Sequence, residues 1–150
     1  MLPMSRGREA ALHCSPNPVT AVEYQELARF RPGAKGVLDF SEQAARAAGL
    51  TPAQHQLLLA VKGARSARPP TIGEVADSLK LRHHSAVELV ERAVAARLVV
   101  READADDARC RRLIMTAEGE DKLAGLSALH REELRHFEEE VLSLTSIPSL

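Results

Sequence analysis

The chain has 150 residues, of which 45% are hydrophobic and 27% charged, and its formal net charge is −1. These values are typical of a single globular domain with its own core. The longest apolar runs, such as Leu57–Val61, are far too short to span a bilayer. No basic segment followed by a long apolar stretch opens the chain, so we expect neither export nor membrane insertion.

Cysteine and aromatic content restrict the class further. Cys14 and Cys110 cannot form a disulfide framework, and no Cys/His spacing typical of a metal site is present. We therefore expect a cytoplasmic protein without a metal or cofactor. Aromatic residues make up 3% of the chain, with no Trp, which disfavours a protein that stacks single-stranded bases. Helix-favouring Ala, Leu, Glu and Arg predominate.

Residues 1–19 contain three prolines and no apolar period, so we expect a flexible N-terminal arm. A capping box, formed by Thr20 and Glu23, then predicts the start of a helix. The apolar pattern continues to residue 48 but is interrupted by Pro32-Gly33. Proline inside a helix costs about 3 kcal/mol, so a break or kink is expected there.

Gly49 occupies the usual position for a glycine that ends a helix. Thr51 as N-cap, Pro52 at the first helical position and Gln54 at the third predict that a second helix begins directly afterwards. A loop follows at residues 66–70. The buried side of this helix is expected to consist of Leu57, Leu58 and Val61.

A third helix is predicted from Thr71, which forms a capping box with Glu74, to Leu79. Lys80–Arg82 is a short turn. A fourth helix is expected over His83–Arg97, and the residues that it directs toward the core are Ala86, Val87, Leu89, Val90, Ala93 and Val94.

The period then changes to that of strands. Leu98–Arg101 is predicted to be a strand, Asp104–Ala108 a polar tip and Arg111–Met115 the returning strand. Thr116 is expected to cap a further helix. Its leucine pattern runs through one or two helices to the end of the chain.

Two short helices joined by a tight turn and followed by a β-hairpin form a winged helix-turn-helix. We therefore predict a mainly α fold with a small β-hairpin wing. The second helix of such a unit is slim enough to enter the major groove of duplex DNA. The charge is divided in a way that suits one nucleic-acid-facing region. Residues 80–115 contain eight Lys/Arg and six Asp/Glu, a net charge of +2. Residues 116–150 contain three Lys/Arg and eight Asp/Glu, a net charge of −5.

The chain resembles the MarR-type family of transcriptional regulators from Thr20 to the C-terminus. The resemblance lies in the order of elements and in two stretches. One is HHSAVELVER at residues 83–92, and the other is a wing with Asp107-Ala108-Arg109 ahead of Ile114-Met115-Thr116.

The resemblance implies one MarR-like domain at residues 20–150. Its winged helix-turn-helix spans about 51–116, and its dimerisation helices span about 20–48 and 117–145. Two subunits would then place their recognition helices in successive major grooves of a palindromic double-stranded DNA operator. Alternatively, the leucine-rich tail packs on the core of its own subunit.

The sequence departs from the family pattern at two places. Pro32-Gly33 falls within a first helix that is usually uninterrupted. Arg97 replaces the glycine that usually precedes the wing, and it has to make a turn that glycine makes at lower cost.

The exposed face of the fourth helix and the wing supply the candidate DNA contacts. Serine can meet either kind of base group, glutamate accepts from cytosine N4, and arginine is the best reader of guanine. A solvated surface helix and a flexible polar hairpin are the competing interpretations, and Thr71 serves equally well as a plain N-cap. The candidates are Thr71, Lys80, Arg82, His83, His84, Ser85, Glu88, Arg92, Arg109 and Arg111.

By the same resemblance, Asp107 is expected to stabilise the wing by pairing with Arg109. Strand alternation puts Arg112 on the opposite face from Arg111. Four acidic residues in this segment weaken any claim of a strongly positive wing. Cys110 lies between two arginines, which would lower the pKa of its thiol, although a small incidental residue is the default interpretation.

An effector pocket is a further possibility, and His55 could equally be a half-buried polar residue of its helix. His83 and His84 diverge by about 100° around a helix, so they do not suit a shared metal ion. His130 and His136 are expected on the surface. The residues that would border the effector pocket are Tyr24, Phe30, Phe40 and His55.

The sequence thus predicts a homodimeric, sequence-specific DNA-binding regulator, a repressor whose affinity a small ligand or stress signal modulates. The alternative is a winged-helix module that binds a protein and not DNA, which the acidic wing tip would suit. No nucleophile–base arrangement, phosphate-cradling glycine loop or metal spacing is present, so an enzyme is not expected.

Overall fold

The computed structural model describes residues 18–145. Within this range the chain forms five helices and one two-stranded antiparallel sheet, which confirms the predicted mainly α fold with a small hairpin. Most of the predicted N-terminal arm, including Cys14, lies outside the described residues. The elements are α2 (Ala21–Ala47), α3 (Pro52–Lys62), α4 (Ile72–Leu79), α5 (His83–Ala95), β1 (Val99–Ala103), β2 (Arg111–Met115) and α6 (Ala117–Thr145).

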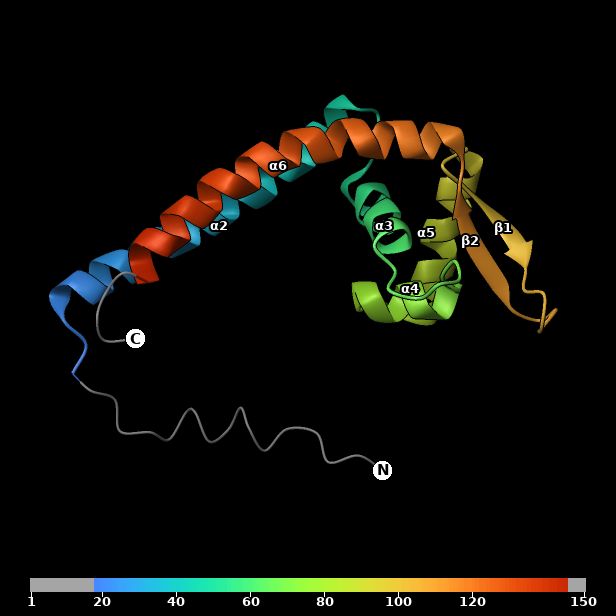
Figure 1. Ribbon diagram of the computed structural model, residues 1–150, viewed down its shortest axis with the longest axis horizontal. Coiled ribbons are helices and arrows are strands. Elements are labelled where there is room, and N and C mark those ends of the chain that lie inside the picture. The colour runs from blue at the N-terminus through green and yellow to red at the C-terminus, as the bar shows by residue number, and fades with distance from the viewer. Residues whose placement is uncertain (1–17, 146–150) are drawn as a thin grey trace.

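The elements are arranged in two parts (Figure 1). Helices α2 and α6 lie side by side and form an elongated stem, while residues 50–116 form a compact head at one end of it. The first turns of α6 contact α3 and β2 of the head. The hairpin β1–β2, which we call the wing, lies at the end of the head farthest from the free ends of the stem. No helix in the described part is long and apolar enough to cross a membrane.

Three helices begin at the predicted threonines. The Oγ1 atoms of Thr20, Thr51 and Thr71 accept hydrogen bonds from the backbone N–H three residues later, at 3.2, 3.1 and 3.2 Å. In each case the side chain at that third position accepts from the threonine N–H in return. Such a cap contributes about 1 kcal/mol, so the local sequence defines where these helices start.

The predicted interruption at Pro32 is wrong. Helix α2 runs unbroken from Ala21 to Ala47 with Pro32 inside it. Proline removes one backbone hydrogen bond and crowds the carbonyl four residues earlier, here that of Ala28. Both residues are exposed, so water can satisfy the freed carbonyl. The neighbouring Phe30 ring packs against Phe137 of α6, with ring centroids 6.1 Å apart, and this contact helps to hold the segment helical.

Three helices end at a residue with left-handed backbone conformation. Gly49 has φ 75° after α2, as its predicted C-terminal position requires, while Lys80 and Arg97 have φ 55° and 59° after α4 and α5. At each end the following N–H donates to a carbonyl five residues earlier at 2.9 Å. For a residue with a Cβ this conformation costs roughly 1–2 kcal/mol. The expectation that Arg97 makes a turn better suited to glycine is therefore confirmed.

The core lies in the head. Its largest fully buried side chains include Leu57 and Leu58 of α3, which were predicted to be buried. The stem contributes Ala45 from α2 and Leu123 and Leu126 from the first half of α6. Val94, predicted to face the core, is 37% exposed because the end of α5 extends past the packed layer. The predicted tail is one continuous helix over the described residues.

Helix α5, the wing and α6 meet at Leu98. Its carbonyl accepts from the Thr116 backbone N–H at 3.0 Å and from the Thr116 hydroxyl at 3.2 Å. The same hydroxyl lies 2.5 Å from the Arg97 carbonyl, and it caps α6, as predicted, by accepting from the Gly119 N–H at 3.0 Å. A Cβ on Gly119 would lie 2.2 Å from the Leu98 carbonyl oxygen, so the close approach requires glycine.

Gly119→Ala is expected to lower the free energy of unfolding by about 1–3 kcal/mol, because the added methyl must displace backbone rather than a flexible side chain. Gly125→Ala is the matched control in the same helix, since nothing lies within 4 Å of its added Cβ. Replacing that exposed helical glycine should raise stability by about 0.5–1 kcal/mol. Urea unfolding followed by circular dichroism measures both changes. Effects of the same sign would show that the contact at Leu98 is not tight.

Candidate functional site

Helices α4 and α5 form the helix-turn-helix predicted from the sequence. The chain turns at Lys80, and the Leu81 N–H donates to the Ala76 carbonyl at 2.9 Å. Helix α5 then starts from Arg82, whose side chain makes no capping hydrogen bond. Buried Val75 and Ala76 of α4 and Leu89 and Val90 of α5 pack the two helices against the core, which directs their other faces to solvent.

The solvent-facing side of α5 holds most of the predicted DNA contacts. Ser85 is half-buried, and the others are exposed. None of these side chains makes a hydrogen bond or ion pair with another described residue. The residues that the structure brings together along this face are Arg82, His83, His84, Ser85, Glu88 and Arg92.

Thr71 and Lys80 lie at the two ends of α4 and differ in their surroundings. Thr71 is half-buried, its hydroxyl is engaged as the N-cap, and its backbone forms an isolated bridge with Arg112. This geometry fits the plain N-cap interpretation of Thr71. Lys80 is exposed at the turn, with no partner among the described residues for its ammonium group.

The wing pairs Val99 with Met115 at its base and Ala103 with Arg111 near its tip. Asp104 holds the tip. One carboxylate oxygen accepts from the Asp106 and Asp107 backbone N–H groups at 2.8 and 3.1 Å, and the other accepts from the Arg112 guanidinium. The Asp104 side chain is only 4% exposed, so this ion pair is shielded from water.

Asp107 stabilises the wing in a different way from the one predicted. Its carboxylate accepts from the Arg109 backbone N–H at 3.0 Å, and its carbonyl accepts from the Cys110 N–H at 2.9 Å. The structure records no ion pair between its carboxylate and the Arg109 guanidinium within the described chain. The predicted pairing is therefore corrected: at the tip of the wing the arginine that pairs with a carboxylate is Arg112, and its partner is Asp104.

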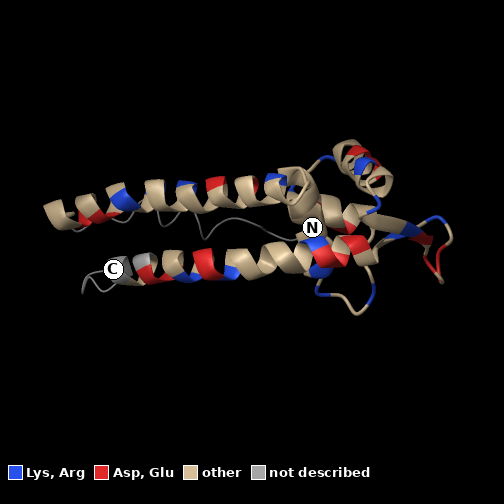
Figure 2. Cartoon of the chain, turned by 90° about the horizontal axis from the view of Figure 1, so that it is seen from above, with Lys and Arg blue, Asp and Glu red and all other residues tan. Residues whose placement is uncertain are grey.

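Arg109 and Arg111 remain on the outside of the wing. Both are exposed, and the Arg111 guanidinium donates only to the Ala108 carbonyl, at 3.1 Å. Residues 99–115 contain four arginines and four acids, and Figure 2 shows both charges over the hairpin. Two of the acids, Asp104 and Asp106, form ion pairs with arginines, so the acidic composition overstates the negative charge of the wing surface.

Sequence reasoning missed the contacts that attach the wing to the head. Arg68, in the loop between α3 and α4, places its guanidinium 2.5 Å from Asp106 and 3.8 Å from Asp104. Arg112 donates to the Pro69 carbonyl at 2.6 Å, and the Leu113 N–H donates to the Pro70 carbonyl at 2.8 Å. Alternation along β2 was the one available signal, because it turned Arg112 away from the outer face.

The four residues proposed to border an effector pocket do not gather at one site. Tyr24 and Phe40 lie on the same helix, 16 residues or about 24 Å apart. Phe40 and His55 both contact the His130 ring, with centroids 5.8 and 4.9 Å from it, whereas Phe30 packs on the outer part of α6. Within one chain the four residues therefore do not line a single pocket.

The histidines at this junction are more buried than expected. His55 is 4% exposed, and burial is the main cause that lowers its pKa, followed by repulsion from His130. His130, predicted to be a surface residue, is half-buried between Ser41 and Leu126, with nitrogen–oxygen distances of 2.8 Å to the Ser41 hydroxyl and 2.6 Å to the Leu126 carbonyl. His136 is exposed, as predicted.

The remaining candidates for metal and thiol chemistry are the clusters of potential ligands and Cys110. Among the described residues, no group of three or more His, Cys, Asp or Glu side chains could hold a metal ion. Cys110 is a free, half-buried thiol at the end of the wing tip.

Helix α4, its tight turn, helix α5 and the hairpin β1–β2 define a winged helix-turn-helix. Residues 48–109 match the model of the MarR family. The chain is thus similar to the MarR family over this segment, as the resemblance seen in the sequence predicted. No curated protein sequence matches the chain.

Solved structures of transcriptional regulators share this fold. AbsC from Streptomyces coelicolor is 17% identical, with 88% of this chain and 90% of that chain covered and a TM-score of 0.66. A MepR variant from S. aureus, bound to an oligodeoxyribonucleotide, is 20% identical, with coverages of 88% and 86% and a TM-score of 0.61. MOSR from M. tuberculosis, in complex with DNA, is 24% identical, with coverages of 83% and 84% and a TM-score of 0.54.

The Asp104 ion pair makes a testable contribution to stability. The hydrogen bond from Arg112, and then the backbone N–H of Asp106, lower the pKa of Asp104 to about 2. Because the pKa is lower in the folded state than the value of about 3.9 expected for an unfolded chain, the stabilisation is complete above about pH 4 and is lost as the pH falls through 2. The difference in unfolding free energy between the wild type and Asp104→Asn should therefore narrow between about pH 4 and pH 2.

Urea unfolding over this pH range measures the difference. Glu102→Gln is the control, because it removes an exposed carboxylate of the same hairpin that makes no ion pair. A difference between wild type and Asp104→Asn that stays constant down to pH 2 would contradict the assignment of Asp104 as the stabilising carboxylate.

Proposed function

We propose that the protein is a homodimeric, sequence-specific double-stranded DNA-binding transcriptional regulator, a repressor whose DNA affinity a small ligand or stress signal modulates. The observation that carries the proposal is the set of unpartnered polar side chains along α5, beside a wing that exposes Arg109. Among residues 18–145 of the same chain, no side chain or carbonyl binds these groups. A nucleic-acid duplex offers base edges and phosphates that match them.

The dimensions and charge of α5 suit the major groove. A helix with its side chains is about 10–12 Å wide, and the groove is about 12 Å wide. The first turn presents Arg82, His83 and His84, while Ser85 and Glu88 follow on the same face. Ser85 can bond several base edges and Glu88 can accept from cytosine, so the helix combines general attraction with the means for discrimination.

The backbone at Lys80 supports a phosphate contact. Lys80 adopts φ 55°, where glycine would cost less, and its ammonium group makes no contact that repays the strain within the described chain. A lysine at this turn, next to the first residue of α5, is well placed to bind the phosphate backbone that flanks the groove. The MepR and MOSR structures, which share this fold and contain DNA, support DNA binding by the chain.

The stem supports the homodimer. Among the described side chains, none is buried in α2 before Ala45 or in α6 after Leu126. Two helices that form no core of their own are poorly stabilised in water, because most helical stability comes from packing an apolar face. Large apolar side chains remain exposed along this pair, and a second copy of the stem would cover them. They include Val22, Leu27, Leu38, Leu129 and Leu134, between 53% and 66% exposed.

A dimer would also explain the modulation by a ligand. The distance between the two α5 helices would depend on how each head joins its stem, and His55, Phe40 and His130 pack at that joint. A ligand that favours one arrangement of the joint would shift the population of the DNA-competent spacing.

Fluorescence anisotropy tests DNA binding. The wild-type chain is expected to bind the duplex upstream of its own gene more tightly than a scrambled duplex, and its affinity should fall with rising salt as counterions are released. Lys80→Gly removes one proposed phosphate contact, so it should reduce the slope of log affinity against log salt by about 1. It also relieves the backbone strain at position 80, so it should raise the free energy of unfolding by about 1 kcal/mol. Equal, salt-independent affinity for both duplexes would favour the protein-binding alternative.

Arg97→Gly is the matched control for Lys80→Gly. It relieves the same backbone strain and removes the same charge, but it lies at the opposite end of α5 from the first turn. We expect the same gain in stability and an unchanged salt slope. If both variants lose the same share of DNA affinity, the contact assigned to Lys80 is wrong.

Analytical ultracentrifugation tests the homodimer. Leu38→Lys places a charge on the exposed stem face, where Leu38 is 66% exposed in one chain, and it is expected to weaken self-association at least tenfold because the charge would be buried in the interface. Val100→Lys is the control, because Val100 is 41% exposed on the wing and lies away from the stem. A wild-type chain that sediments as a monomer at micromolar concentration would contradict the proposal.

A further inference from the structure

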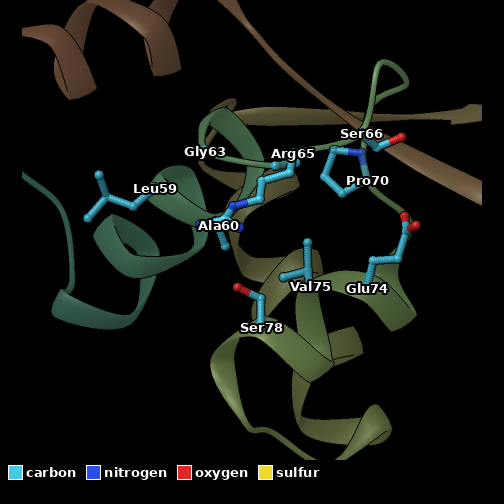
Figure 3. A pocket seen from close by; sticks show the side chains of 10 residues that line it. Leu59, Ala60, Gly63, Arg65, Ser66, Pro70, Glu74, Val75 and Ser78 are labelled. Atoms are coloured by element: carbon cyan, nitrogen blue, oxygen red, sulfur yellow. The ribbon is translucent and has the colours of Figure 1, made fainter.

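A cleft separate from the α5 face and the stem opens between α3 and α4 (Figure 3). Its volume is about 370 Å³, which falls at the small end of the range for small-molecule sites. The loop that joins the two helices closes one side of it. The residues that determine its chemistry are Leu59, Ala60, Arg65, Glu74, Val75 and Ser78.

The cleft has opposite charges at its two ends and an apolar middle. In Figure 3 the Arg65 guanidinium reaches toward Ala60, on the same side as the Ser78 hydroxyl, while the Glu74 carboxylate points toward Pro70. Val75 lies between the two charged groups. Arg65 and Glu74 form no ion pair with each other, so each can serve a ligand that lies between them.

The polar atoms at both ends retain bonding capacity. The Arg65 guanidinium makes no hydrogen bond or ion pair with any other described residue. One oxygen of Glu74 accepts from the Thr71 N–H at 2.7 Å as part of the capping box. The Glu74 charge also attracts the Arg112 guanidinium, but no hydrogen bond or ion pair joins the two side chains, so the other oxygen can still accept from a ligand. A guanidinium with a hydroxyl beside it suits a carboxylate, and a carboxylate suits an ammonium group.

We propose that this cleft binds a small linear zwitterion of the ω-amino acid class. The ligand carboxylate binds Arg65 and the Ser78 hydroxyl, its methylene chain lies over Ala60 and Val75, and its ammonium group binds Glu74. An α-amino acid carries both charged groups on one carbon atom, whereas Val75 lies between the two charged side chains of the cleft. The spacing of the charges therefore selects for a ligand whose charged groups are separated.

The cleft is connected to the wing through its own wall. The loop that carries Arg65 also carries Arg68, which pairs with Asp106 of the wing tip at 2.5 Å, and Pro69, whose carbonyl accepts from Arg112 at 2.6 Å. A ligand that holds this loop would restrict the wing as well. Any consequence for DNA affinity rests on the proposed function, whereas occupancy of the cleft does not.

Titration of the DNA-free, full-length chain with 6-aminohexanoate, followed by ¹H–¹⁵N NMR, tests the site. Saturable shifts are expected for backbone amides of residues 59–78. Hexanoate and hexylamine each lack one charged group and should bind at least about tenfold more weakly. Saturable binding of either analogue with the affinity of 6-aminohexanoate would overturn the proposal, and so would shifts confined to other parts of the chain.

Two variants assign the ends of the ligand. In Arg65→Gln, which lacks the partner of the carboxylate, 6-aminohexanoate should bind no more tightly than hexylamine. In Glu74→Gln, which lacks the partner of the ammonium group, it should bind no more tightly than hexanoate. Glutamine at position 74 keeps the capping box, so α4 is preserved. Arg31→Gln is the control for the loss of an exposed arginine elsewhere and should leave the affinity unchanged. Because no DNA is present, failure of this site and failure of DNA binding are distinguishable.

Discussion

The carbonyl group of Leu98 fixes the relative positions of α5, the wing and the start of α6. It accepts hydrogen bonds from both the backbone and the hydroxyl of Thr116, and it lies so close to the start of α6 that Gly119 has no room for a side chain. Helix α5 ends directly before this carbonyl, β1 begins after it, and β2 and α6 join at Thr116. Helix α5, the wing and the start of α6 are therefore held in one arrangement at Leu98, because a shift of any one of them breaks bonds to the others.

A second, polar constraint acts at the far end of the wing. Asp104 connects the turn at the tip to Arg112, and Arg68 extends this charge network to the loop between α3 and α4. A two-stranded hairpin alone is marginally stable in water. Here it is anchored at its base by Leu98 and near its tip by the α3–α4 loop, so its outer arginines project from a supported strand pair. These ion pairs also neutralise Asp104 and Asp106, whose negative charges would otherwise repel an anionic partner.

The parts of the structure that could be predicted from the sequence are those that local chemistry determines. The capping boxes at Thr20, Thr51 and Thr71, the glycine end at Gly49 and the change to strand period after α5 each act within a few residues. The errors concern contacts distant in sequence. Pro32 remains inside α2 because the stem supports it, and the junction of α2, α3 and α6 partly buries His130. The wing departs from Asp107–Arg109 pairing because Arg112 reaches Asp104 across the hairpin. The helical pattern predicted that most of the candidate contacts of α5 are exposed, and the capping box predicted that the Thr71 hydroxyl is engaged as the N-cap of α4.

The distribution of buried residues distinguishes the head, which has its own core, from the outer stem, which has none. The head completes its own core with little help from the stem, which supplies Ala45, Leu123 and Leu126. The outer stem leaves large apolar side chains exposed, while the start of α5 leaves several polar side chains without a partner among the described residues, and these two surfaces lie at opposite ends of the molecule. An apolar surface favours another protein surface, whereas cationic and hydrogen-bonding groups favour a polyanion. In the proposed dimer the stem is covered while the exposed face of α5 stays open, and the hydrogen bonds at Leu98 connect these two parts of the chain.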